Sequence, residues 1–379
     1  MLNLILAGTI AFLVTFLAIP AIIKVADEKR LFDMPDGRKL HSRPIASLGG
    51  VGIFIGFILG LLLSITNKLN PEFQYFFAAA LLTFFLGVKD DILVLSATKK
   101  FIGQVVAAAI IIHLGGVQID SMHGFLGVHQ IPEGWSLALT YMTVIVVINA
   151  FNLIDGVDGL AASLGILTTS IFGLYFYVAH MPAYAILAFA MTGSLCGFLI
   201  FNYNPAKIFM GDSGSLLIGL VNAILVIKFI TVADITAGSF PIESSVAIGF
   251  SILIVPLLDT LRVFAIRIFK GKSPFSPDRN HIHHLLLDRG LNHRHVTLIC
   301  VLTNAGFIGV SYFGRGLGST VLLSAIIPIC FTLIAILKYV RKSSDTLVIS
   351  TSFQPNNDAA LQSTTKVVAL NTEVAAAEQ

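Results

Sequence analysis

Long apolar segments separated by short polar ones recur along most of the chain. A helix needs roughly 20 apolar residues to cross the hydrocarbon core of a membrane. Segments that approach this length cover residues 2–23, 46–66, 73–89, 100–116, 136–152, 160–180, 183–201, 214–232, 245–268, 296–313 and 318–339. The pattern predicts an all-α integral membrane protein with about eleven transmembrane helices within residues 1–340.

The composition supports this prediction. Hydrophobic residues make up 56% of the 379 residues and charged residues 12%, whereas a soluble domain carries roughly 25% charged residues. The three cysteines all lie in apolar segments, which is typical of packing residues rather than of disulfides. Residues 341–379 are rich in Ser, Thr, Ala, Asn and Gln and predict a disordered tail. Basic residues are scattered among loops, so no nucleic-acid partner is expected.

The distribution of lysine and arginine predicts the orientation in the membrane, because cytoplasmic loops carry an excess of both. With the N-terminus outside, 21 of the 24 lie on the cytoplasmic side, and only Lys68, Lys228 and Arg315 lie outside. The segment at residues 2–23 has no basic residue before it and Lys24 after it. This favours an uncleaved first helix, with the C-terminus in the cytoplasm.

The stretch NAFNLIDGVDGLA at residues 149–161 is the densest polar motif. Asn149, Asn152, Asp155 and Asp158 recur at every third position between two apolar segments. Such side chains are costly near a bilayer and are rarely kept there without a partner or a function. They could hold a hard cation, accept hydrogen bonds from a sugar, or do both. A polar helix end with a glycine turn is the structural alternative.

Two further carboxylate motifs lie on the same predicted side of the membrane. Asp90 and Asp91 are adjacent at the end of one span, and adjacent carboxylates need a cation or a proton to share. Asp212 follows Gly211 at the start of another span. A carboxylate there suits Mg²⁺, which leaves room for phosphate oxygens. Both motifs could instead cap their helices.

Two cytoplasmic loops, at residues 37–50 and 270–290, are basic. They contain Arg38, Lys39, Arg43, Arg279, His281, His283 and His284. The first loop suits an anionic head group at the membrane surface, although an ordinary cytoplasmic flank would also be basic. The histidine and arginine side chains of the second suit an anion clamp. A zinc site is less favoured, because adjacent histidines rarely chelate one ion and no cysteine is near.

Taken together, these motifs resemble the polyprenyl-phosphate N-acetylhexosamine-1-phosphate transferases, glycosyltransferase family 4. The resemblance rests on KDD at 89–91, NxxNxxDGxDGL at 149–160, PAKxFMGDSGSxxxG at 205–219 and PDRNHIHH at 277–284. The HIHH form is similar to the WecA/TagO-like branch, whereas the phospho-N-acetylmuramoyl-pentapeptide branch has three consecutive histidines. The resemblance implies a bacterial inner-membrane protein whose active site is formed by cytoplasmic loops and helix ends.

The resemblance also implies a reaction. N-acetylhexosamine 1-phosphate, with N-acetylglucosamine favoured, passes from a UDP-sugar to undecaprenyl phosphate and releases UMP, as the first membrane step of cell-envelope polysaccharide synthesis. Mg²⁺, replaceable by Mn²⁺, is expected on Asp212 and Asp155. Catalytic roles are implied for Asp90, Asp91, Asp155 and Asp158. Substrate-binding roles are expected for Asn152, Asn202, Lys100, Arg279, His281, His283, His284, Arg38, Lys39 and Arg43.

An ion-coupled transporter is the alternative class. Its relay carboxylates would lie near the membrane midplane, whereas the carboxylates of this chain lie at span ends on one face. An intramembrane metalloprotease is a third class, but the HExxH motif is absent. For a transferase, direct attack by the lipid phosphate is simpler than a two-step mechanism, because a phosphate monoester is mostly dianionic at neutral pH. The oligomeric state, including a homodimer, stays open.

Overall fold

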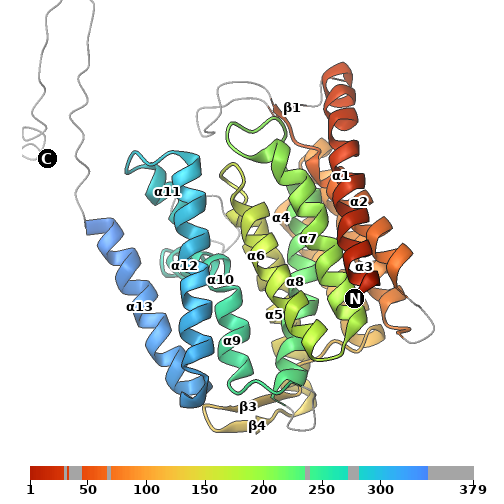
Figure 1. Cartoon of the computed structure of the whole chain (residues 1–379). Coiled ribbons are helices and arrows are strands. Elements are labelled where there is room, and N and C mark those ends of the chain that lie inside the picture. Colours follow the sequence, from red (N-terminus) through yellow and green to blue (C-terminus); the bar gives the residue numbers. More distant parts are fainter. Residues whose placement is uncertain (30–31, 34–44, 66–69, 235–239, 272–280, 340–379) are drawn as a thin grey trace, which may run out of the picture. The chain divides into compact units, whose positions relative to one another are not determined.

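The structure is a computed structural model that describes residues 1–29, 32–33, 45–65, 70–234, 240–271 and 281–339. Its helices lie side by side (Figure 1). In chain order they are α1 (Leu2–Lys29), α2 (Gly49–Ser64), α3 (Phe73–Leu93), α4 (Ala97–Ala109), continued by the π-helical η2 (Ile110–Leu114), α5 (Glu133–Ile154), α6 (Leu160–Val178), α7 (Pro182–Asn202), α8 (Gly211–Ala233), α9 (Ser245–Ile252), α10 (Ile254–Phe269), α11 (Ile282–Leu287), α12 (His293–Phe313), the 3-10 helix η3 (Arg315–Leu317) and α13 (Ser319–Tyr339).

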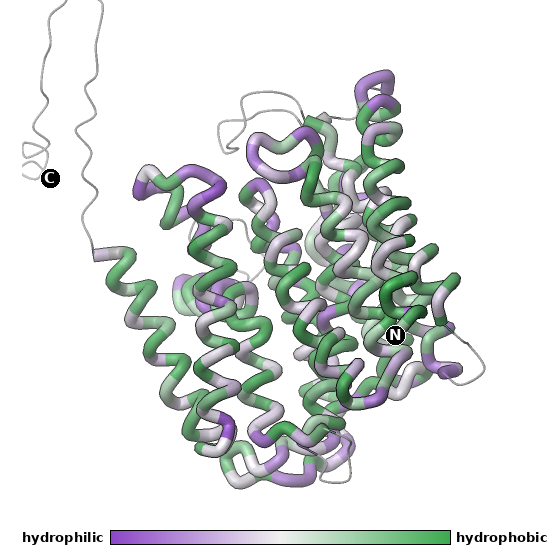
Figure 2. The backbone as a smooth tube through the Cα atoms, viewed as in Figure 1, coloured by the Kyte–Doolittle hydropathy of each residue, from purple (hydrophilic) through white to green (hydrophobic). Residues whose placement is uncertain are grey.

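Two short antiparallel sheets complete the described part. The strands β1 (Phe32–Asp33) and β2 (Ile45–Ala46) pair with each other, as do β3 (Ser121–Phe125) and β4 (Val128–Gln130). The β3–β4 hairpin lies at one end of the helices, and the α5–α6 turn, the α7–α8 connection and α11 lie at the other (Figure 1). Hydrophobic residues dominate along the helices, and hydrophilic residues gather at both ends (Figure 2).

Membrane-spanning helices are confirmed as the main elements of the chain. Among the described helices, eight are long and apolar enough to cross a membrane, or nine if the bent pair α9–α10 forms one span. The helix α2 is apolar but shorter, with 16 residues, and α3 carries the charged residues Lys89, Asp90 and Asp91 near its C-terminal end. The all-α multi-span membrane fold is thus confirmed, while the number of eleven spans is not.

The prediction of one continuous helix over residues 245–268 is wrong. The segment forms α9 and α10, which are bent by 83° relative to each other, and Leu253 between them leaves helical geometry with φ −106° and ψ 16°. Pro256 lies in the first turn of α10. Proline has no backbone N–H and clashes with the preceding turn, so it kinks or breaks a helix, and the break at Leu253 lies just before Pro256.

The helix α8 lies at the centre of the packing. In an apolar stretch of 18 residues, 83% of the residues of α8 are buried, compared with 22% in α1. The helices α2, α3 and α5 all pack against it. A Cβ atom on Gly87 of α3 would lie 2.4 Å from the Cα of Ser213, so only glycine allows α3 to lie this close to the first turn of α8. This approach brings the charged end of α3 to the start of α8.

The basic residues Arg38, Lys39, Arg43 and Arg279 lie outside the described residues, as does the tail predicted over residues 341–379. Their expected roles therefore stay predictions.

Candidate active site

Four helices bring their polar ends together around Asp212, in the first turn of α8. One carboxylate oxygen of Asp212 accepts a hydrogen bond from the Asn152 amide at 2.9 Å, and the other accepts one from the Lys100 ammonium at 2.5 Å. Lys100 also forms an ion pair with Asp90. We call Asp90, Lys100, Asn152 and Asp212 the carboxylate cluster. It joins α3, α4, α5 and α8, so motifs far apart in sequence meet as the resemblance implied.

Asp91, the neighbour of Asp90, has a different environment. Its two carboxylate oxygens accept hydrogen bonds from the backbone N–H of Asp212 at 2.7 Å, from the backbone N–H of Ser213 at 3.1 Å and from the Ser213 hydroxyl at 2.7 Å. The first N–H groups of a helix have no partner within the helix. Asp91 therefore caps α8 from α3, which leaves the Asp212 carboxylate free of any capping role.

Asp158 links the α5–α6 turn to the α7–α8 connection and to α12. Its carboxylate accepts hydrogen bonds from the Asn204 amide at 2.8 Å and from the Ala206 N–H at 3.2 Å, and it lies 3.3 Å from His293 Nδ1. Burial alone would raise the pKa of Asp158, but the hydrogen bonds from His293 and Asn204 hold it below its usual value. Asp158 is thus an ionised anchor for the turn, lying outside the spans.

Asp155, in the same turn, lacks such partners. Among the described residues, none donates a hydrogen bond to its carboxylate. Burial, followed by the charges of Asp212, Asp91 and Asp158, raises the pKa of Asp155 well above its usual value. Carboxylates that raise each other's pKa in this way need a proton or a cation between them. Asp155 and Asp212 could therefore share a cation, as the resemblance implied, and this stays a prediction.

Asn202, which the resemblance assigns to substrate binding, is buried and used within the protein. Its oxygen accepts a hydrogen bond from Gly159 N–H at 2.9 Å, and its amide donates one to the Ile208 carbonyl at 2.9 Å. The oxygen and the nitrogen of this side-chain amide together link the α5–α6 turn to the α7–α8 connection. Asn202 thus positions the two connections, and its expected role in substrate binding stays a prediction.

The three histidines lie on or next to α11, which packs against the α5–α6 turn. A Cβ atom on Gly156 would lie 2.5 Å from His283 Nε2, so glycine is required where the two motifs touch. The ring of His283 stacks on that of His281, with centroids 5.5 Å apart, and lies 4.4 Å from the ring of His284. The histidine helix and the Asp155–Asp158 turn therefore form one surface.

His283 is the most buried of the three histidines. It is only 2% exposed, and burial, opposed by Asp259, lowers the pKa of its imidazole to about 3. The lowered pKa favours the neutral imidazole, which would contact an anion through a hydrogen bond rather than a positive charge, and the substrate-binding role of the three histidines stays a prediction.

Asp259 of α10 contacts the histidine motif and is a residue that the sequence reasoning missed. It is 1% exposed. One oxygen lies 2.9 Å from His281 Nδ1, and the other accepts hydrogen bonds from Ile282 N–H at 2.8 Å and Arg262 at 3.3 Å. A carboxylate inside an apolar segment often indicates a function. Asp259 lies inside the apolar segment 245–268, so the sequence did contain this indication.

Comparisons with known proteins agree with this geometry. The profile of glycosyl transferase family 4 matches residues 73–230. Decaprenyl-phosphate N-acetylglucosaminephosphotransferase of Mycobacterium leprae is 31% identical, over 82% of this chain and 83% of its own. A probable undecaprenyl-phosphate N-acetylglucosaminyl 1-phosphate transferase of Bacillus subtilis is 32% identical, over 81% and 83%.

A third relative comes from another bacterium. Undecaprenyl-phosphate alpha-N-acetylglucosaminyl 1-phosphate transferase of Escherichia coli K12 is 30% identical, over 78% of this chain and 79% of its own. The resemblance first seen in the separate motifs is confirmed by similarity over most of the chain. The protein belongs to glycosyl transferase family 4.

Proposed function

We propose that the protein transfers N-acetylglucosamine 1-phosphate from UDP-N-acetylglucosamine to a polyprenyl phosphate and releases UMP. The three relatives described above are named for transfer of N-acetylglucosamine phosphate to a polyprenyl phosphate. The observation that carries the proposal is the meeting of Asp90, Lys100, Asn152 and Asp212 next to Asp155. Carboxylates, an amide and an ammonium at the ends of apolar helices suit the joining of a soluble anion to an anionic lipid.

The donor set fits a divalent cation. The described residues contain no group of three His, Cys, Asp or Glu side chains placed to hold a metal by themselves, but Mg²⁺ needs only one or two protein carboxylates when phosphates supply further oxygens. Asp212 and Asp155 would hold Mg²⁺, or Mn²⁺ in its place. When bound, the ion would neutralise charge on the reacting phosphates.

The proposed step is a single displacement at phosphorus. An oxygen of the lipid phosphate forms a bond to the phosphorus that carries the sugar, and the bond from that phosphorus to the UMP oxygen breaks. With a second pKa of about 6, a phosphate monoester is already mostly dianionic at neutral pH, so the attack requires no base. The Lys100 ammonium offsets the repulsion between the two phosphates, and Asp212 and Asp90 hold that ammonium in place.

The membrane orientation is part of the proposal. We infer a bacterial inner-membrane protein with its N-terminus outside and the carboxylate cluster at the cytoplasmic face. The excess of basic residues on one side supports this, as does the solubility of a nucleotide sugar. The transporter alternative has no support, since the carboxylates stand at helix ends and the relatives are named as transferases.

A reconstituted assay tests the proposal. Purified protein is incubated with undecaprenyl phosphate and radiolabelled UDP-N-acetylglucosamine, UDP-N-acetylgalactosamine or UDP-glucose, and lipid-soluble label is counted. We expect product from UDP-N-acetylglucosamine, loss of product with EDTA, and recovery with Mg²⁺ or Mn²⁺. Undecaprenol, which lacks the phosphate, is the control acceptor and should give none. No lipid product from any nucleotide sugar would reject the proposal.

A further inference from the structure

The bend between α9 and α10 leaves backbone groups without helical partners. In an unbroken helix the carbonyl of Ile252 would accept a hydrogen bond from the backbone N–H of residue 256, but that residue is Pro256, which has no N–H. An unsatisfied backbone group inside a membrane protein is costly. Something other than the helix itself must therefore complete the bend.

Asn304 of α12 supplies the missing partners. Its amide donates a hydrogen bond to the Ile252 carbonyl at 2.9 Å, and its oxygen accepts one from Val255 N–H at 3.1 Å. Asn304 is fully buried. One side chain thus replaces the proline's absent donor on one side of the bend and binds the first turn of α10 on the other.

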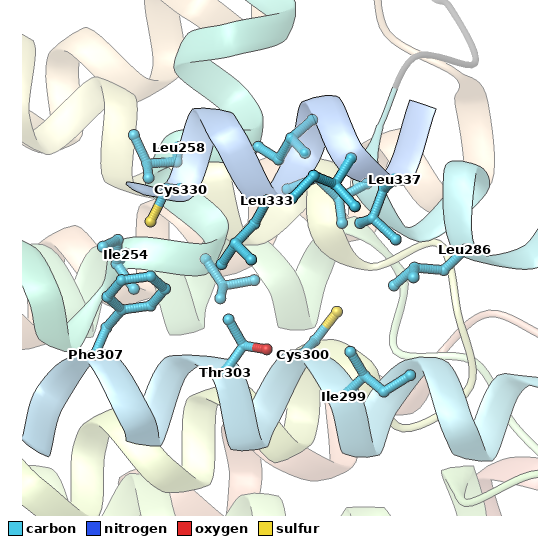
Figure 3. Close-up of a pocket in the computed structure, with 14 residues that line it drawn as sticks. Ile254, Leu258, Leu286, Ile299, Cys300, Thr303, Phe307, Cys330, Leu333 and Leu337 are labelled. Carbon is cyan, nitrogen blue, oxygen red and sulfur yellow. The ribbon is translucent and has the colours of Figure 1, made fainter. Parts of the chain in front are cut away.

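Packing around α10 is uneven, because this helix packs closely against α5 but loosely against α12. An apolar cavity of about 280 Å³ lies between α10, α11, α12 and α13 (Figure 3). Leu258 of α10, Leu286 of α11, and Cys300 and Phe307 of α12 point into it. Protein interiors contain few voids larger than a water molecule. On the side that faces α12, the position of α10 therefore depends on the hydrogen bonds of Asn304 more than on interlocking side chains.

Asp259 links α10 to α11, the histidine helix. This carboxylate accepts a hydrogen bond from Ile282 N–H at 2.8 Å, at the first residue of α11, and contacts His281 at 2.9 Å. The neighbouring His283 then packs against Gly156 in the α5–α6 turn. A continuous series of contacts leads from α12 to the carboxylate side of the site.

We propose that Asn304 and Asp259 act in series as positioning residues for the histidine helix. Asn304 fixes the bend that places α10, and Asp259 fixes α11 against the α5–α6 turn. The inference rests on the proposed function and on the prediction, implied by the family resemblance, that His281, His283 and His284 bind the UDP-sugar.

The decisive variant is Asn304→Leu in the full-length protein, which removes both hydrogen bonds and keeps a side chain of similar size. The KM for UDP-N-acetylglucosamine should rise about tenfold, while the KM for polyprenyl phosphate changes less than about twofold, since α3, α4, α5 and α8 keep their places. A purely structural defect would reduce the amount of active enzyme, and so kcat, without changing either KM.

Asn222→Leu is the matched control. Asn222 is also a buried amide in a membrane helix, but its Nδ2 donates to Ile218 of the same helix, and its Oδ1 has no partner among the described residues. Because Asn222 joins no two helices, both KM values should stay unchanged in this variant.

A second variant tests the series. Asp259→Asn still has an oxygen for Ile282 N–H but loses the second oxygen that faces His281. Asp259→Asn should also raise the KM for UDP-N-acetylglucosamine. Adding Asn304→Leu to this variant should raise that KM less than about twofold further, because the effects of residues that act through one another are not additive. Fully additive effects would contradict the series.

A structural measurement separates this inference from the proposed function. Spin labels at the exposed residues Lys207 and Asp288 report the distance from the α7–α8 connection to the end of α11. Asn304→Leu should broaden this distance distribution, and Asn222→Leu should not. An unchanged distribution in Asn304→Leu would overturn the inference. A broadened distribution in a protein that uses no nucleotide sugar would reject the proposed function and leave the positioning role standing.

Discussion

The carboxylate cluster stands at the ends of the helices α3, α4, α5 and α8, whereas the histidine helix depends on a pair of helices bent by 83°. In the first region, side chains at neighbouring helix ends contact each other directly. In the second, Asn304 replaces a backbone hydrogen bond that Pro256 cannot make. In the first region, packing of α3 and α5 against α8 sets the helix positions. Single substitutions there should therefore change turnover more than they change the structure. The second should respond to the loss of single hydrogen bonds.

The largest effect is expected from Asp212→Asn. Asparagine keeps the shape of the side chain but loses the charge that pairs with Lys100 and would bind the cation. Asp91, and not Asp212, caps α8, so stability should barely change. Turnover should fall by roughly 100-fold or more, as expected for loss of one electrostatic group in a reaction centre. The measurement is lipid-linked product across a Mg²⁺ titration, together with the melting temperature.

Asp120→Asn is the control for Asp212→Asn, since Asp120 is an exposed carboxylate just before the β3–β4 hairpin and should be silent. Near-normal turnover of Asp212→Asn at low Mg²⁺ would remove Asp212 from the reaction centre.

A smaller effect is expected where the two regions touch. Gly156→Ala would bring a methyl group within 2.5 Å of His283 Nε2. Overpacking of this kind typically costs about 1–3 kcal/mol, so kcat/KM for the UDP-sugar should fall roughly tenfold. Gly134→Ala is the control, because a Cβ there meets nothing within 4 Å. Equal activity of the two variants would show that the histidine helix does not need this contact.

The smallest effect on the reaction itself is expected from Asp91→Asn. Losing one acceptor oxygen weakens the cap of α8, and loss of a cap costs about 0.5–2 kcal/mol of stability. The melting temperature should fall, and activity should fall only in proportion to the folded fraction, with both KM values unchanged. Lost turnover in a fully stable Asp91→Asn protein would instead return Asp91 to the catalytic role that the resemblance implied.

The carboxylate cluster could be predicted because its residues interrupt apolar runs at their ends. Asp90, Asn152 and Asp212 all mark the borders of spans, where polar side chains are conspicuous. The division of roles could not be predicted. Asp91 accepts hydrogen bonds from residues more than 120 positions away, and nothing local distinguishes it from Asp90.

The histidine region shows where sequence reasoning reaches its limit. Hydropathy averages over many residues, so a single proline did not divide the apolar run at 245–268. Asp259 and Asn304 were visible as isolated polar residues in apolar segments, but their partners depend on which helices pack together. The lowered pKa of His283 follows from its burial in the folded protein, which the histidine-rich sequence does not reveal.

The most direct test of the central claim follows two labels at once. Purified protein is given undecaprenyl phosphate and UDP-N-acetylglucosamine with ³H in the sugar and ³²P in the phosphate attached to it. Transfer of N-acetylglucosamine 1-phosphate predicts that both labels enter the lipid product in equal amounts and that unlabelled UMP is released. Sugar label in the lipid without the ³²P, accompanied by release of labelled UDP, would mean transfer of the sugar alone and would contradict the account.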